Sequence, residues 1–130
     1  MISARVRRLS PAEVSAYDLV PSWVARRAVL IRVPVLPPGA SGLTSGRFVL
    51  LRRDEPEDGT STLIAHELVH VRQFAELGRL RFGLRYVSSY LANVARLRSH
   101  RRAYLDIPAE VEAYGKARAW SAGRQTGLRS

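Results

Sequence analysis

Two histidines four residues apart, His66 and His70, have the types and spacing that can bind one metal ion. On a helix this spacing places both side chains on one face, so both imidazoles can reach the same ion. Glu67 directly follows the first histidine and can reach a water at the edge of such a site. In that chemistry zinc lowers the pKa of the water and the glutamate takes its proton. The pattern therefore predicts metal-dependent hydrolysis with Glu67 as general base.

The match is specific enough to outweigh coincidence. A random arrangement of the same composition would produce this His-Glu-x-x-His pattern in roughly one sequence in 300. The flanking positions are apolar, which predicts a buried helix: Leu63, Ile64, Leu68 and Val71. A buried group of histidines and a glutamate without partners would be costly. The competing interpretation, a polar patch on an exposed helix, is therefore the weaker one.

A tetrahedral hydrolytic site takes a third protein ligand and leaves one position for water. Because the chain has no cysteine, the candidates are Glu110, Glu112 and His100. The two glutamates lie about 200° apart around a helix axis and cannot both face one ion. Glu112 precedes Lys116 by four residues, a favourable surface pair, whereas Glu110 shares its face with small and aromatic residues. We therefore predict Glu110 as third ligand and keep Glu112 as the alternative.

An oxyanion formed during hydrolysis would need a hydrogen-bond donor or a positive group near the metal. His100, Tyr104 and Tyr114 are the candidates for that role. His100 lies beside Arg101 and Arg102, which also fits an ordinary surface histidine. For the two tyrosines, packing in the core or at its rim is the competing explanation.

Three helices must position these side chains. Thr60 or Ser61 can cap the helix that carries the histidines, and the helix should run to Leu77 and end at Gly78. An amphipathic helix should follow from Leu80, because apolar residues recur there every three or four positions up to Leu97. A last helix should begin around 106–108 and reach about residue 121. The tail over 122–130 should fray.

In the N-terminal half, the sequence predicts short helices and two strands. Ser10 to Glu13 is a capping box with proline at the first helical position, so a helix should form before Pro21. A further helical turn is expected over 23–27, which makes residues 1–27 a helical segment. The apolar runs 28–33 and 47–52 predict strands. With a turn-rich loop over 37–46 between them, they suggest a small antiparallel sheet.

Length and composition restrict the class of protein. A chain of 130 residues has room for one domain, which we take as residues 1–130. The net charge of +10 comes from 21 basic residues, of which Lys116 is the one lysine, and the arginines are spread along the chain. A solvated basic surface is the first interpretation, and attraction to anionic lipid or nucleic acid is the second. With neither a membrane-spanning segment nor a signal peptide in the sequence, we expect a cytoplasmic location.

The motif residues also carry a family resemblance. His66–His70 (HELVH) followed by Pro108–Ala113 (PAEVEA) resembles the gluzincin-type zinc metallopeptidases, in particular the very small minigluzincins. The resemblance implies a zincin-like fold and a third ligand at the first glutamate of the E-x-E-A segment, Glu110. Tyr114 stands where many relatives carry Asp or Asn to orient a zinc histidine.

The same resemblance implies how a substrate would bind. Gly42–Leu50 resembles the strand that precedes the zinc helix in these families. Its edge would pair with an extended peptide by strand addition. The residues implied in substrate binding are Phe48, Val49, Leu50 and Leu51.

Together these observations predict an α+β, zincin-like domain that binds one Zn²⁺ through His66, His70 and Glu110. The expected activity is cleavage of peptide bonds in a peptide or protein substrate. Two alternatives stay open. One is a basic module that binds lipid or nucleic acid and carries a structural or degenerate zinc site. The other is a metallopeptidase kept latent by a terminal segment or by self-association through the stripe from Leu80 to Leu97. The sequence does not predict an oligomeric state.

Overall fold

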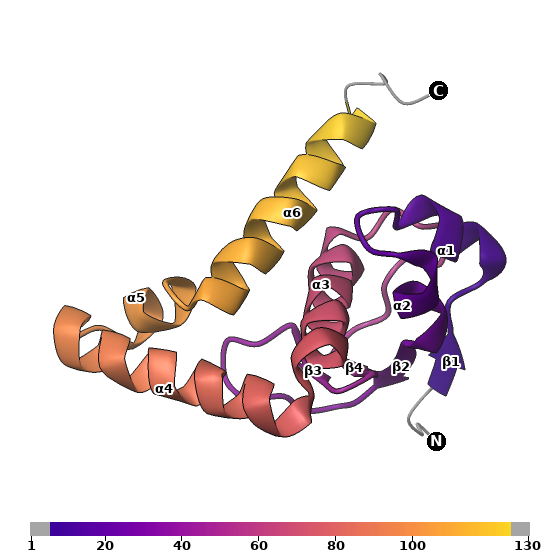
Figure 1. The fold of residues 1–130 in the computed structure, drawn as a ribbon. Helices are drawn as coiled ribbons and strands as arrows, with labels where there is room; N and C mark the ends of the chain where they lie inside the picture. The colour runs from indigo at the N-terminus through magenta and orange to yellow at the C-terminus, as the bar shows by residue number, and fades with distance from the viewer. Residues whose placement is uncertain (1–5, 126–130) are drawn as a thin grey trace.

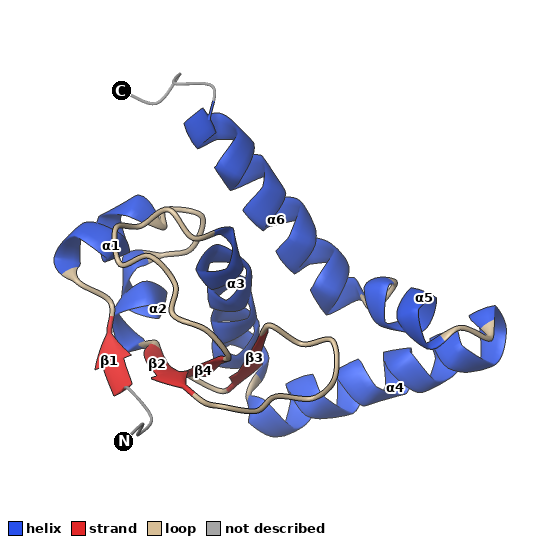
Figure 2. Cartoon of the chain, turned by 180° about the vertical axis from the view of Figure 1, so that it is seen from behind, coloured by secondary structure: helices blue, strands red, loops and turns tan. Residues whose placement is uncertain are grey.

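The structure is a computed structural model that describes residues 6–125, apart from the side chains of Arg79, His100, Arg124 and Gln125. Its described part is α+β, with a four-stranded sheet and six helices. The chain first builds the sheet with two short helices, then the central helix α3, and then three helices that run away from the sheet and return (Figures 1 and 2). Among residues 6–125, no helix combines the length and apolar character needed to cross a bilayer.

The N-terminal segment begins with a strand and not with a helix. β1 (Val6–Arg8) precedes α1 (Pro11–Ala16) and α2 (Ser22–Arg27). The capping box at α1 is present: Ser10 Oγ accepts from Glu13 N, and the Glu13 side chain accepts from Ser10 N. The prediction of a wholly helical N-terminal segment is therefore wrong for 6–8, where the run Val-Arg-Arg is too short to show the alternation of a strand. Residues 1–5 lie outside the described part.

The sheet is mixed, which corrects the prediction of a purely antiparallel one. β2 (Val29–Arg32) pairs parallel with β4 (Phe48–Leu51), and β3 (Gly42–Ser45) pairs antiparallel with β4. The strand order is β1-β2-β4-β3. The sequence did not predict β3 as a separate strand because Gly-Leu-Thr-Ser has only one large apolar residue. This extra strand reverses the chain before β4, so β4 runs in the same direction as β2.

A two-residue hairpin fixes the register of β3 and β4. Ser45 pairs with Phe48 across the loop formed by Gly46 and Arg47. Gly46 has φ +66° at the first loop position, where hairpin turns of this length favour glycine. The hairpin places β3 at the edge of the sheet, next to α3.

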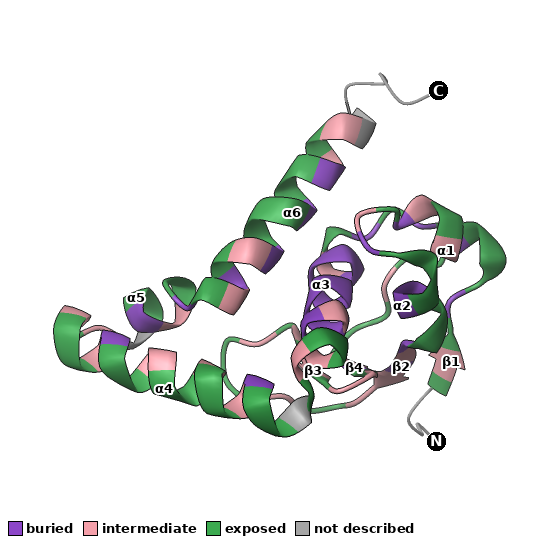
Figure 3. Ribbon diagram, viewed as in Figure 1, coloured by how far each residue is buried: buried purple, intermediate pink, exposed green. Residues whose placement is uncertain are grey.

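The central helix α3 (Thr62–Leu77) is buried through its middle, from Ile64 to Val71 (Figure 3). The sheet, α2, α4 and α6 all pack against it. The core joins α3 to both ends of the chain, and its largest fully buried side chains include Tyr17, Ile64 and Leu68. A helix enclosed on so many sides can hold its polar side chains in fixed positions.

The C-terminal half is all helical. α4 (Arg79–Leu97) extends away from the sheet, α5 (His100–Leu105) makes the turn, and α6 (Pro108–Gln125) returns along α3 (Figure 1). Arg98 follows the last residue of α4 and caps it at φ +53°. A non-glycine residue in this conformation is an unusual helix cap, which explains why the sequence predicted no separate α5. Because α6 continues to Gln125, the prediction of a frayed tail is wrong for 122–125. Residues 126–130 lie outside the described part.

Candidate metal centre

Helix α3 holds both histidines and the intervening glutamate in place. Ser61 caps its start, since the hydroxyl oxygen accepts a hydrogen bond from Ile64 N at 3.0 Å. The helix ends at Gly78, at φ +82°, as predicted. The Nε2 atoms of His66 and His70 lie 3.2 Å apart on the face of α3 that α6 covers. Both histidines are buried.

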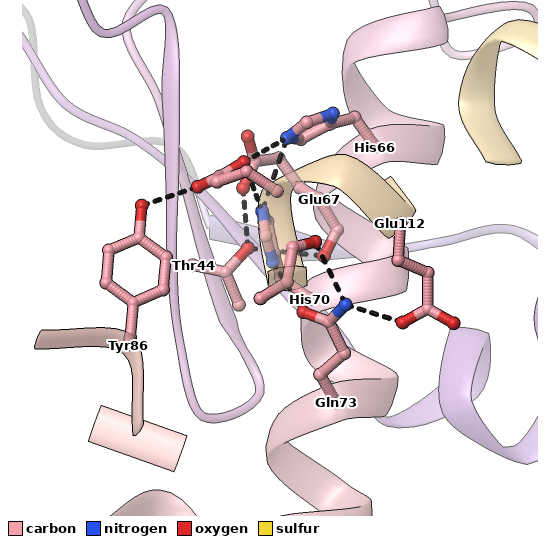
Figure 4. Close-up of polar contacts among 9 residues, drawn as sticks. Thr44, His66, Glu67, His70, Gln73, Tyr86 and Glu112 are labelled. Atoms are coloured by element: carbon pink, nitrogen blue, oxygen red, sulfur yellow. Dashed lines mark hydrogen bonds and ion pairs between the residues drawn. The ribbon is translucent and has the colours of Figure 1, made fainter. Parts of the chain in front are cut away.

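The first turns of α6 bring a carboxylate to the two histidines. Glu110 Oε1 lies 3.1 Å from His66 Nε2 and 3.1 Å from His70 Nε2. Figure 4 shows the two histidines with Gln73 and Tyr86 near them. All three side chains are buried, and their ligand atoms lie within 4.8 Å of one another. This His–His–Glu cluster (His66, His70 and Glu110) could hold a metal ion. It is the only group of three such residues that meets this distance within the described part of the chain.

Glu112 is held away from the cluster. Its Oε1 atom lies 2.6 Å from an Arg72 guanidinium nitrogen and accepts a hydrogen bond from Gln73 Nε2 at 2.7 Å. Burial would raise the pKa of Glu112, but the hydrogen bonds from Gln73 and Arg72 outweigh it and lower the pKa. Of the two glutamates considered as third ligand, the structure therefore places Glu110 against both histidines.

Gln73 determines which nitrogen of His70 is available. Its side-chain nitrogen donates to Ala109 O at 3.1 Å and to Glu112, so its oxygen must accept. That oxygen lies 2.8 Å from His70 Nδ1, which therefore carries the hydrogen. The lone pair of a neutral His70 is then on Nε2, directed at the cluster. This is the arrangement in which a histidine binds a metal, with its other nitrogen donating to an oriented acceptor.

The donor set fits a metal ion. A lone pair on His70 Nε2 faces a carboxylate oxygen at 3.1 Å, a contact that is repulsive unless a proton or a cation lies between them. Burial lowers the pKa of His70, but the hydrogen bond and charge of Glu110 outweigh it and raise the pKa, so the surroundings favour positive charge. Ligand atoms about 2.0–2.1 Å from a tetrahedral ion lie roughly 3.3–3.4 Å apart. The separations of 3.1–3.2 Å are close to that value.

Tyr86 on α4 holds the other oxygen of Glu110. Its hydroxyl donates to Glu110 Oε2 at 2.6 Å, which leaves Oε1 to face the histidines. Burial alone would raise the pKa of Glu110, but hydrogen bonds with His66, His70 and Tyr86 hold it well below its usual range. Burial and the Glu110 charge in turn raise the pKa of Tyr86, so the phenol remains a donor. Glu110 is therefore a fixed, ionised carboxylate.

Glu67 points toward the edge strand. Thr44 Oγ1 on β3 donates to Glu67 Oε1 at 2.7 Å, and a Cβ on Gly42 would lie only 3.0 Å from Glu67 Oε2. A glycine at position 42 therefore lets the strand backbone lie directly against the carboxylate. Burial raises the pKa of Glu67 above its usual value, despite the opposing effects of both histidines and Thr44. A carboxylate with a raised pKa accepts a proton more readily near neutral pH.

The residues considered as oxyanion donors have different surroundings. The Tyr114 ring packs against His66 with centroids 4.3 Å apart, edge to face, at the position where relatives were expected to carry Asp or Asn. Burial and the Glu110 charge raise the pKa of Tyr104, so it remains protonated. The backbone of His100 begins α5, and its side chain lies outside the described part of the structure.

The strand expected to bind substrate has no free edge. Phe48–Leu51 form β4, which pairs with β2 on one side and with β3 on the other. Its backbone cannot take an added strand, so the expectation for these residues is wrong. Within the described sheet the free edge near α3 belongs to β3. Ser41 O accepts from Arg52 N, so by alternation the N–H and C=O groups of Gly42 and Thr44 point outward.

A pocket of about 750 Å³ lies beside the cluster. Its walls come from the end of α3, from α4 and from the start of α6, and include Gln73, Phe82, Tyr86 and Ile107. Two of these residues, Gln73 and Tyr86, also contact members of the cluster. The pocket is therefore adjacent to the candidate metal centre, and its mixed apolar and polar lining is typical of small-ligand sites.

The comparisons with known proteins match part of this region. The family model of the eCIS core domain matches residues 37–77, which include β3, β4 and α3 up to its last residue. The matched segment carries Thr44, His66, Glu67 and His70, and it ends well before Glu110. No curated protein and no solved structure matches the chain.

Proposed function

We propose that this chain is a zinc-dependent hydrolase, most specifically a metallopeptidase of the zincin-like type. The observation that carries the proposal is the buried convergence of His66, His70 and Glu110, from two helices, beside Glu67. Two imidazole nitrogens and one carboxylate oxygen match the three protein ligands of catalytic zinc sites, which leave one position open. A gluzincin-type assignment, with Glu110 as third ligand, remains part of this proposal.

Zinc, when bound, would supply Lewis acidity that activates a water and polarises a carbonyl. The chain's own residues would supply the rest. Glu67, with its pKa raised by burial, would accept a proton and later give it to the leaving amine. Thr44 would keep the carboxylate turned toward β3 by donating to Oε1. Tyr86 and Gln73 would fix Glu110 and His70, so the ligands need little reorganisation.

The free edge of β3 favours an extended peptide as substrate. The outward N–H and C=O groups of Gly42 and Thr44 would pair with the peptide backbone, and Glu67 lies directly behind this strand. Strand addition at β3 would hold the peptide near the candidate metal centre without a large cleft. This placement replaces β4 with β3 as the proposed substrate-binding strand. The cytoplasmic location stays a prediction.

The experiment compares peptide cleavage by zinc-loaded wild type with that by Glu67→Gln, using an unstructured protein substrate and mass spectrometry of the products. Loss of a general base should reduce kcat by roughly 10²–10⁴-fold, while zinc content stays near that of wild type. Glu57→Gln is the matched control, because Glu57 is exposed on the loop before α3 and does not line the pocket beside the cluster. It should cleave like wild type.

Two results would contradict the proposal. Cleavage by Glu67→Gln at the wild-type rate would mean that the activity does not arise at this site. Zinc-loaded wild type that cleaves neither peptides nor simple amides would assign the cluster a structural role.

A further inference from the structure

The outward face of α4 is an apolar stripe exposed to solvent. Leu80, Leu84, Val87 and Leu91 recur at helical spacing and are 78%, 61%, 53% and 60% exposed. The opposite face of the same helix carries the buried Phe82 and Asn93 and so packs onto the protein. The apolar stripe (Leu80, Leu84, Val87 and Leu91) is therefore not the side that forms the core, although burial against the protein is the usual fate of such a stripe.

The segment that carries the apolar stripe is strongly basic, although Arg96 is paired with Asp106. Residues 78–105 include Arg79, Arg81, Arg85, Arg96, Arg98, Arg101 and Arg102, and they contain no aspartate or glutamate. Arg81 and Arg85 are exposed and lie about 90–130° around the helix from the centre of the stripe. An apolar face bordered by arginines is the pattern of a helix that lies in a membrane interface.

The positive charge around α4 favours one binding partner for the apolar stripe over the others that such a surface could bind. A second copy of this chain would bring a second arginine-rich helix against the first, and like charges would oppose that contact. A nucleic acid would pair with the arginines but would leave four large apolar side chains in water. An anionic bilayer accommodates both, because acyl chains take the stripe and lipid headgroups take the arginines.

We propose that α4 docks the protein on anionic lipid bilayers, with the apolar stripe inserted at the boundary between headgroups and acyl chains. This binding surface is independent of the proposed hydrolysis. Of the apolar stripe, Leu84 also lines the pocket beside the candidate metal centre. Docking would use the outward face of α4, whereas Tyr86 reaches Glu110 from another side of the helix. The candidate metal centre would keep its contacts on the membrane.

Sedimentation with vesicles of phosphatidylserine and phosphatidylcholine, compared with phosphatidylcholine alone, tests the proposal. Wild type should bind the anionic vesicles. Leu84→Glu and Leu91→Glu should each reduce binding roughly tenfold or more, because each puts a charge into the inserted face. Val35→Glu is the matched control, since Val35 is 77% exposed on a loop elsewhere. It should bind nearly as wild type does, and thermal melting should show that all variants are folded.

A second pair of variants tests the location of the charge. Arg81→Gln with Arg85→Gln removes two positive charges beside the stripe, and Arg26→Gln with Arg27→Gln removes two from exposed positions on α2. Binding should fall several-fold for the first pair and little for the second. Equal losses would mean diffuse attraction to net charge and would overturn the assignment to α4.

Three other outcomes would also overturn the proposal. One is wild type that fails to bind anionic vesicles at low salt. Another is concentration-dependent dimerisation that Leu84→Glu abolishes, which would identify a second copy as the occupant. The third is binding to DNA or RNA but not to vesicles.

Discussion

At the scale of single residues, the candidate metal centre depends on the direction of the hydrogen bonds that orient His70 and Glu110. Gln73 uses both its N–H groups on Ala109 and Glu112, so its oxygen holds the hydrogen of His70 Nδ1 and leaves Nε2 free. Tyr86 occupies one oxygen of Glu110 and leaves the other for the cluster. A metal-binding group is thus defined as much by these neighbours as by its three members.

Metal content should distinguish the two glutamates of α6. Glu110→Ala removes a member of the cluster, so purified protein supplied with zinc should lose most of its bound metal by elemental analysis. Glu112→Ala should retain it, with an affinity reduced by about 10-fold or less, because Glu112 acts through Gln73. Equal loss in both variants, or wild type that stays metal-free when zinc is supplied, would contradict the assignment.

The sequence predicted part of this residue-scale picture. His66, Glu67 and His70 follow from spacing alone. Helix geometry shows that Glu110 and Glu112 cannot both face one ion, and the pairing of Glu112 with Lys116 favours Glu110. Gln73 carried a usable signal, since it is a polar residue three positions after His70 on the same face of the helix. No sequence signal indicated Thr44 or Tyr86. Thr44 reaches Glu67, and Tyr86 reaches Glu110, only because elements distant in the sequence pack together in the fold.

At the scale of elements, β3 replaces β4 as the strand proposed to bind substrate. Its hairpin turn and its pairing with β4 leave the outward groups of Gly42 and Thr44 at the edge of the sheet. The predicted strands 28–33 and 47–52 and the motif helix all exist, with ends shifted by a residue or so. Sheet order could not be predicted, because the periodicity of one strand does not indicate which neighbour it will pair with.

The edge of β3 makes a prediction for peptide binding. Thr44→Pro removes an outward N–H that an added strand would use, and proline is tolerated at such an edge position. Thr44→Val removes the hydroxyl contact with Glu67 but keeps the N–H. Steady-state kinetics should therefore show a KM roughly 5-fold or more higher for Thr44→Pro than for Thr44→Val. Equal KM values would mean that the peptide does not pair with β3.

At the scale of the whole molecule, the two ends of the chain stabilise each other around α3. Trp120 on α6 donates from its indole nitrogen to Ala16 O at 3.0 Å, and its ring lies 5.2 Å from that of Tyr17. Burial raises the pKa of Tyr17 to about 12, and its hydroxyl accepts a hydrogen bond from Ser61 N beside the cap of α3. The N-terminal helices, the central helix and the last helix therefore form one core.

A buried ion pair near the start of the chain should make stability depend on pH. Glu13 is fully buried and lies 2.7 Å from Arg7. Burial would raise its pKa, but the hydrogen bonds from Arg7 and Ser10 outweigh it and lower the pKa. A carboxyl with a lowered pKa in the folded state adds stability above its unfolded pKa, and that stability is lost as the pH falls through the folded value.

Glu13→Gln should therefore lower the free energy of unfolding by about 1–3 kcal/mol at pH 7. The difference from wild type should shrink as the pH falls below about 4, where the carboxyl of the unfolded chain takes up a proton and the folded one still resists it. Urea unfolding between pH 3 and pH 7 measures this, with Glu76→Gln as an exposed control. A difference that stays constant over this range would show that the charge of Glu13 adds no stability.

The position of Glu110 in the chain has a consequence for synthesis. His66, Glu67 and His70 leave the ribosome long before α6, the helix that supplies the carboxylate and covers α3. A nascent chain that has not yet reached residue 110 can offer an ion two imidazoles and no third ligand. Metal loading should therefore wait until α6 has emerged and packed on α3, so that a chain interrupted between these helices cannot form the complete His–His–Glu cluster.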